Sequence, residues 1–280
     1  MPLSSTSSGF SWHHLNQWHI GAVPLVLMAL ALTAYALGVR RVPRWSRARS
    51  ASFAAGVAVT FLATQSVLGV YDMAYFSAHM IQHLTLIMVA APLFALAAPL
   101  DLFYAAAGAH TRAVLDGRLM AVLTHPLVGF GTYVVVIPVT HLSGVANQMM
   151  LHPWVHHAEQ FAFLVVGYLF FRAAFGLERG RTLHRGLRLV YVMAAVPVDT
   201  FTGLALVMTS ALPFPAYREM APRGSTTQWM LSNVHLGGAI MWIGGDALML
   251  LACIPITAAW VRWETANTKV LDAELDRLGR

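Results

Sequence analysis

Long apolar runs, separated by short polar or proline-containing segments, follow one another along the whole chain. These runs and the breaks between them predict seven helices of roughly 20 residues, the length that crosses a lipid bilayer. The predicted helices cover residues 20–39, 51–70, 78–104, 126–141, 156–175, 187–211 and 231–260. The pattern therefore predicts an all-α fold, a polytopic bundle of seven transmembrane helices.

Prolines inside the third helix and the polar ends of the chain add detail to the seven-helix prediction. Pro92 and Pro99 lie inside the third predicted helix, which we expect to kink or end early. No Ser- or Gly-rich linker divides the chain. We therefore predict an outer N-terminal segment (1–19), one transmembrane domain (20–260) and a cytoplasmic tail (261–280). The tail is expected to form a short amphipathic helix, with its apolar side made of Val270, Leu271, Leu275 and Leu278.

Composition supports the membrane interpretation and excludes several classes of protein. Of the 280 residues, 58% are hydrophobic and 11% charged, whereas soluble domains carry about 25% charged residues. Cys253 is the single cysteine, which excludes a disulfide framework and a cysteine-based metal site. The chain has no phosphate-binding glycine loop, no GxSxG elbow and no HExxH motif.

Basic residues indicate the direction of the chain. All but two of the 18 lysines and arginines fall in connections, or in the tail, that the seven-helix prediction places on one side. By the positive-inside rule that side is cytoplasmic, so the N-terminus lies outside. The loops also account for the basic net charge without a nucleic-acid partner. A multi-pass protein of a bacterial inner membrane is expected.

Histidines gather on the opposite side. Ten of the 13 lie at or near the outer ends of the predicted helices: His13, His14, His19, His79, His83, His141, His152, His156, His157 and His235. An isolated histidine at a membrane interface is ordinary, because an amphipathic ring finds a local partner there. Histidines at several helix ends and at one depth favour a shared cause, such as a metal site.

The spacing of two histidines suits metal binding. His79 and His83 are four residues apart, so their rings project from one face of a helix, with Gln82 beside them. In the segment HPWVHHAEQ, His152, His156 and Glu159 offer imidazole and carboxylate groups at helical spacing. Thioether sulfur from Met80 would favour Cu(I). The three histidines of the Ser-rich N-terminus are weaker candidates.

Two aspartates are predicted to lie deep in the membrane. Asp199 and Asp246 fall near the middle of the sixth and seventh helices, where an ionised carboxylate costs about 2.5–3.5 kcal/mol. They either line a polar path for metal or protons or form hydrogen bonds between helices.

The segment HMIQHLTLIMVAAPLFALAAPL, from His79 to Leu100, resembles the signature of the seven-helix CtaG-like cytochrome c oxidase assembly factors. The motifs THPL, HHAEQFAF and GGAIMWIGGD follow in the order of that family. The resemblance implies maturation of a haem–copper oxidase by supply of copper to its catalytic subunit at the outer face. It extends from about residue 20 to 255 and carries over, by position, to His79, Gln82, His83, His141, His156, Glu159, Gly237, Gly238, Met241 and Trp242.

Two positions depart from the family. Gln160 stands where the family often has a second histidine after the glutamate, and Asn233 and His235 stand where it usually has glutamines. Either one ligand has moved from the fifth helix to the seventh, or the metal-binding assignment does not hold for this member of the family.

These observations lead to one hypothesis with three rivals. We expect an accessory protein that holds copper, or zinc, and is not itself an enzyme. Its expected ligands are His79, His83, His141, His156 and His235, supported by Gln82, His152, His157, Glu159 and Met80. Its expected partners are oxidase subunits, a periplasmic copper donor, the lipid bilayer and a second copy of the chain. The rivals are a haem- or metal-dependent membrane enzyme, a copper transporter using Asp199 and Asp246, and a metal-free scaffold.

Overall fold

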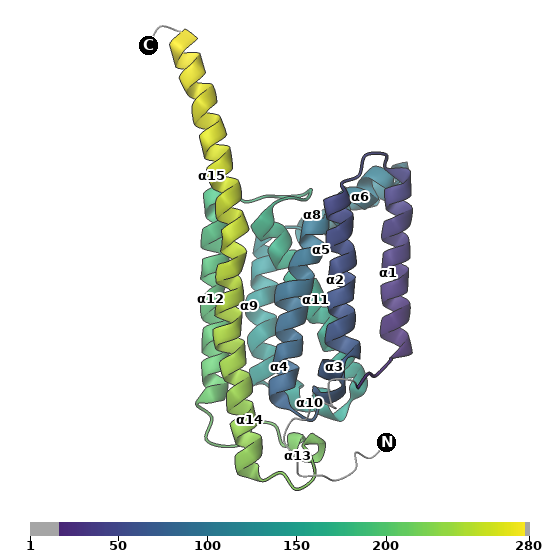
Figure 1. Ribbon diagram of the computed structural model, residues 1–280, viewed down its shortest axis with the longest axis vertical. Coiled ribbons are helices and arrows are strands. Elements are labelled where there is room, and N and C mark those ends of the chain that lie inside the picture. Colours follow the sequence, from purple (N-terminus) through teal and green to yellow (C-terminus); the bar gives the residue numbers. More distant parts are fainter. Residues whose placement is uncertain (1–16, 278–280) are drawn as a thin grey trace.

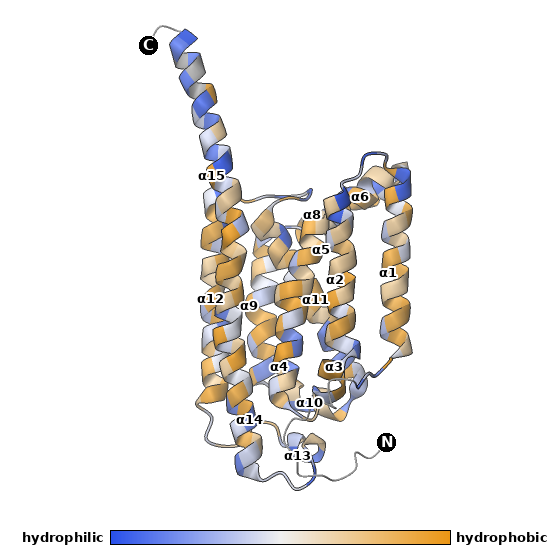
Figure 2. Ribbon diagram, in the orientation of Figure 1, coloured by the Kyte–Doolittle hydropathy of each residue, from blue (hydrophilic) through white to orange (hydrophobic). Residues whose placement is uncertain are grey.

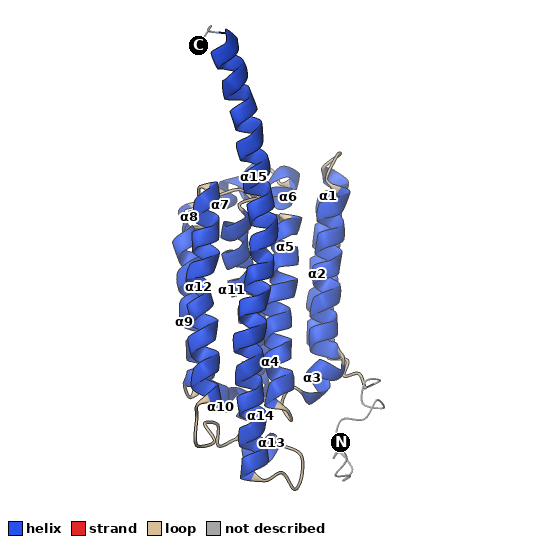
Figure 3. Ribbon diagram, turned by 60° about the vertical axis from the view of Figure 1, so that its left-hand side comes forward, coloured by secondary structure: helices blue, strands red, loops and turns tan. Residues whose placement is uncertain are grey.

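A computed structural model of the protein describes residues 17–277, and all regular structure in that part of the chain is helical (Figures 1 and 3). Within it, six helices are long and apolar enough to cross a membrane, and a bent pair of helices makes a seventh if the pair forms one span. The predicted all-α bundle is confirmed. The direction of the chain across the membrane stays a prediction, and His13 and His14 lie outside the described residues.

The spans run up and down the bundle in chain order (Figure 1). They are α1 (Ala22–Arg41), α2 (Arg47–Gln65), α4 (Phe76–Thr85) with its continuations, α9 (Pro126–Leu142) bent by 64° into α10 (Val145–Leu151), α11 (Pro153–Phe175), α12 (Arg185–Val207), and α14 (Thr227–Ala239) with α15 (Gly245–Arg277). Short helices connect them: α3 (Val67–Tyr71), α7 (Ala109–Leu115), α8 (Arg118–Leu123) and α13 (Tyr217–Met220). We call the end where α4 and α11 begin the histidine end, and the opposite end the arginine end.

The third span is broken, as its prolines predict. It consists of α4, the π-helical turn η2 (Leu86–Ala90), α5 (Ala91–Ala97) and α6 (Pro99–Ala106). The π turn comes just before Pro92, which lacks an N–H and crowds the preceding turn. Ala98 adopts a left-handed conformation with φ of 49°, and Pro99 starts the next helix in a new direction. The early end of the span is therefore explained by Pro99.

The last span differs from its prediction. It passes through a second π turn, η3 (Ile240–Gly244), and then continues as one helix to Arg277. The tail is not a separate short helix, because α15 extends beyond the bundle at the arginine end (Figure 1). This extension is mostly hydrophilic (Figure 2), and Val270 within it is exposed.

Helix α11 forms the centre of the bundle. Its most apolar stretch is 61% buried, more than that of any other span in the described chain. The Phe170 ring lies 4.7 Å from that of Tyr133 on α9 and 4.8 Å from that of Tyr191 on α12. Large aromatic rings thus fill the middle of the bundle. They separate polar groups at its two ends.

At the arginine end, a partly buried polar cluster joins the helices. We call it the arginine-end clasp, and it consists of Arg49, Asp101, Thr124, Tyr168, Arg172, Glu178 and Arg179. Arg172 is 1% exposed and donates to the carbonyl oxygens of Arg179 and Thr124. Glu178 accepts hydrogen bonds from the Leu100 N–H at 2.5 Å and the Tyr168 hydroxyl at 2.6 Å. Burial raises the pKa of the Glu178 carboxyl to about 7.

Candidate metal centre

Three helices bring histidines together at the histidine end. His79 and His83 come from α4, His141 from the last turn of α9, and His156 and Glu159 from the first two turns of α11. All five side chains are buried, the most exposed being His156 at 6%. These five residues, far apart in sequence, form the site that we call the histidine cluster.

Three donor atoms at the middle of the cluster face one another. The Glu159 Oε2 atom lies 3.6 Å from the His83 Nε2 atom and 3.8 Å from the His79 Nε2 atom. Each residue of this trio offers a ligand atom, and all three lie within 4.8 Å of one another. A first-row metal binds imidazole nitrogen at ~2.0–2.1 Å, so two ligands on one ion stand up to ~4 Å apart. The trio fits a single small cation with little adjustment.

One buried atom of each residue in the trio lacks a hydrogen-bond partner within the described protein. The His79 Nδ1, His83 Nε2 and Glu159 Oε2 atoms are buried and unpartnered. A buried polar atom without a partner costs about 1–3 kcal/mol, and most proteins avoid this. Such atoms on metal-binding residues are explained if a ligand completes their bonding.

His141 controls the hydrogen positions on His83. The His141 Nδ1 atom lies 2.8 Å from the Ile137 carbonyl oxygen, which only accepts, so we assign the ring hydrogen to Nδ1. In a neutral ring the His141 Nε2 atom then carries a lone pair, 3.4 Å from the His83 Nδ1 atom. His83 is thereby assigned its hydrogen on Nδ1, which leaves a lone pair on its Nε2 atom. That lone pair faces Glu159.

A network of amides packs against the cluster. The Gln82 side-chain nitrogen donates to Asp72 at 2.7 Å and to the Ala63 carbonyl at 3.0 Å. Its oxygen accepts from the Gln160 amide at 3.0 Å. The His156 Nε2 atom lies 3.3 Å from the same Gln82 oxygen and 3.5 Å from Asp72. The His156 Nε2 atom therefore has protein partners, unlike the His83 Nε2 atom.

Asp72 was missed by the sequence analysis. It lies between α3 and α4 and is 5% exposed. Burial raises the pKa of its carboxyl to about 7. One signal was available: Asp72, Glu159 and Glu219 are the acidic residues that the seven-helix prediction places at the outer ends. Gln160, at the position where the family often has histidine, also joins the network through its amide.

Four of the residues named from the sequence lie elsewhere. The His235 Nε2 atom bonds to the Thr209 carbonyl at 2.9 Å. Met80 is buried on the side of α4 that faces Gly237 of α14. His152 is exposed at the start of α11, and His157 is exposed with its Nδ1 atom 3.4 Å from Gln160. None of these four belongs to the histidine cluster as defined above.

Each deep aspartate accepts a hydrogen bond from a side chain on a neighbouring helix. The Tyr133 hydroxyl donates to Asp199 at 2.6 Å, which joins α9 to α12. The Thr200 hydroxyl donates to Asp246 at 2.9 Å, which joins α12 to α15. These bonds account for the aspartates as contacts between helices.

Comparisons with known proteins identify a family and several relatives. The family model described as "Cytochrome c oxidase caa3 assembly factor (Caa3_CtaG)" matches residues 33–263. An uncharacterized protein of Mycobacterium leprae is 28% identical over 260 residues, and one of Mycobacterium bovis is 27% identical over 259. Each alignment covers 87% of this chain and 38% of the relative, so the chain spans less than half the length of those proteins. No solved structure matches.

Proposed function

The chain belongs to the cytochrome c oxidase caa3 assembly factor family, and we propose that it assists assembly by carrying copper. The histidine cluster binds the ion and releases it to the catalytic subunit of the oxidase. The observation that carries this proposal is the convergence of buried ligand atoms of His79, His83 and Glu159 within 4.8 Å of one another, on residues that each also carry one unpartnered atom. The role is accessory, and copper is the cargo.

The donor set is chemically suited to this cargo. Imidazole binds copper well, and also zinc, iron and nickel. Because the family serves a haem–copper oxidase, copper is the ion we assign, with zinc as its competitor. Thioether sulfur from Met80 is not part of the set, since Met80 faces α14. A site of two imidazoles and one carboxylate leaves open positions on the ion, which favours transfer over permanent storage.

The residues have different roles in this proposal. His79 and His83 are the primary ligands, as expected from their spacing on α4. Glu159, expected only to orient an imidazole, is assigned as the third ligand because its free oxygen faces both rings. His141 holds His83 in the ligating tautomer. His156 steadies the amide network beside the trio.

A metal-binding measurement on the purified protein tests the proposal. The protein is loaded with copper, and separately with zinc, and bound metal is measured by elemental analysis. The double variant His79→Ala/His83→Ala should lose the stoichiometric copper. His235→Ala is the matched control, because it removes a histidine of the same end that lies outside the cluster, and it should bind as the parent does.

Two results would contradict the proposal. Copper binding that survives the double variant would place the metal elsewhere, and loss of copper in His235→Ala would restore the ligand expected on the seventh helix. A crystal loaded with copper, measured at the copper absorption edge, gives the ion's position directly.

The cellular setting completes the proposal. We place the chain in the bacterial inner membrane with the histidine end outside, where a periplasmic donor and the oxidase both have access. Co-purification of the oxidase catalytic subunit with the chain, weakened in the His79→Ala/His83→Ala variant, would support transfer between them. A second copy of the chain is a further partner to be tested by its mass in detergent.

A further inference from the structure

A cavity lies next to the histidine cluster. Its volume is about 460 Å³, and it opens between the end of α9, the turn into α10 and the connection after α12. His141, Ser143 and Asn147 line one side, and Ala205 and Thr209 line the other. No charged side chain is among its lining residues, all of which the structure describes.

His141 is common to the cavity and the cluster. Of the five cluster residues, His141 alone lines this cavity. Its Nε2 atom contacts His83, whose own Nε2 atom faces Glu159. His141 therefore connects the cavity lining to the donor trio.

The opposite side of the cluster is closed more firmly. There Gln82 makes hydrogen bonds to Ala63 and Asp72, and its oxygen contacts Gln160 and His156. Passage on that side would break several of these contacts at once. Passage on the cavity side requires the His141 ring to leave His83, a contact that is long at 3.4 Å, and to release its Nδ1 atom from the Ile137 carbonyl.

The end of α9 is also suited to movement. Pro138 lies three residues before His141 and removes one backbone hydrogen bond from that turn. The helix then ends at Leu142 and the chain bends by 64° into α10. A helix end with fewer internal bonds opens at lower free energy than a helix interior.

We propose that this cavity is the exchange route, through which copper passes between a donor or acceptor and the donor trio when the His141 ring swings aside. This inference rests on the proposed function. The bond between the copper ion and its carrier breaks as bonds to His83, His79 and Glu159 form, with no change of oxidation state.

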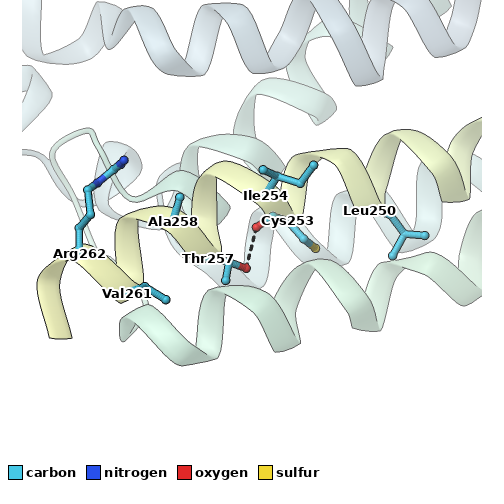
Figure 4. Close-up of a pocket in the computed structure, with 7 residues that line it drawn as sticks. All are labelled: Leu250, Cys253, Ile254, Thr257, Ala258, Val261 and Arg262. Atoms are coloured by element: carbon cyan, nitrogen blue, oxygen red, sulfur yellow. Dashed lines mark hydrogen bonds between the residues drawn. The ribbon is translucent and has the colours of Figure 1, made fainter. Parts of the chain in front are cut away.

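Blocking the cavity with a thiol-directed reagent tests the route. Cys253, the single cysteine, is not among the cavity-lining residues and lies in an apolar groove of α15 beside Thr257 (Figure 4), so a Cys253→Ser background leaves no native thiol. Ser143→Cys puts one thiol in the lining, and Ala205→Cys puts one across the cavity on α12. Leu151→Cys is the control, exposed at the end of α10 and outside the lining.

Each variant is labelled with a bulky thiol reagent and mixed anaerobically with a Cu(I)–bicinchoninate complex, and the rate and final amount of copper transfer are measured. We expect at least a tenfold slower transfer in labelled Ser143→Cys and Ala205→Cys, at unchanged final stoichiometry. Unlabelled proteins and labelled Leu151→Cys should transfer at the parent rate.

The outcomes separate the route from the site. Unchanged rates in both labelled cavity variants, or slowing confined to Leu151→Cys, would overturn the route while leaving the copper site intact. An unlabelled protein that takes up no copper would overturn the proposed function, and the route with it.

Discussion

The two ends of the bundle both bury polar groups, but they treat them differently. In the arginine-end clasp, Glu178 has two hydrogen-bond donors and Arg172 has two carbonyl acceptors, with only the Arg172 Nε atom unpartnered. In the histidine cluster, His79, His83 and Glu159 each carry one unpartnered buried atom, and their ligand atoms lie within 4.8 Å of one another. Unpartnered buried atoms destabilise a protein, so the first end favours stability, whereas the second carries a cost that a bound ion would relieve under the proposed function.

The largest effect on stability is expected from Arg172→Met. This change removes a buried cation and leaves the carbonyl oxygens of Thr124 and Arg179 without their donor. We expect a loss of about 3–5 kcal/mol in unfolding free energy. Thermal unfolding in detergent measures it, and copper bound per folded molecule should stay the same. A variant as stable as the parent would show that the clasp is not structural.

Glu159→Gln is expected to have the opposite outcome, a loss of copper binding without a loss of stability. The amide keeps the shape of the side chain but removes a buried negative charge that has no arginine or lysine beside it. The metal-free protein should therefore be as stable as the parent or more so. Copper affinity should fall about 100-fold or more, because the third ligand is weakened. Competition with a chelator measures the affinity. If the variant lost stability as well as copper affinity, the proposed difference between the two ends would be wrong.

A smaller effect is expected from His141→Phe. The ring remains, but His83 loses the acceptor that fixes its hydrogen on Nδ1. Copper affinity should fall about 10- to 100-fold, as is typical for partners of metal-binding histidines. His141→Gln, whose oxygen can accept from His83, should recover part of the loss. No recovery, or no loss, would show that His141 does not act through His83.

The smallest effect is a pH dependence at the arginine end. The pKa of Glu178 is raised from 4.5 to about 7 in the folded protein, so between these values the folded state binds more protons than the unfolded state. Stability from this group is therefore full below about pH 4.5 and declines as pH rises through 7. Asp72 contributes with the same sign. Glu178→Gln should flatten the decline seen in melting temperature between pH 5 and 8 in the parent, and an unchanged slope would contradict this.

Much of the fold follows from the sequence, because about 20 consecutive apolar residues have few stable arrangements outside a bilayer. The placing of His79 and His83 side by side was predictable too, since residues four apart share a helix face. The early end of the third span was also predictable, because Pro99 cannot continue the preceding helix. The continuous α15 was not predictable, because an amphipathic pattern does not say whether a helix breaks before it.

The composition of the cluster was only partly predictable. Glu159 and His156 were named, but their contacts depend on the rotation of α11, which the sequence does not give. His235 was expected among the ligands, yet the rotation of α14 directs its ring to Thr209. Asp72 lies in a connection without helical periodicity, so no face could be assigned to it.

The π turn of α4, η2, has a consequence for how this chain tolerates insertions and deletions. A π turn accommodates one residue more than an α-helical turn, so its extra residue adds little net rotation to the span. Deleting one residue between Leu86 and Ala90 would therefore yield a regular helical turn and leave His79 and His83 close to their present orientation towards Glu159. The same deletion in a regular α-helical stretch would turn the two parts of the span by about 100° relative to each other, so the irregular turn is the place where the third span best tolerates a change of length.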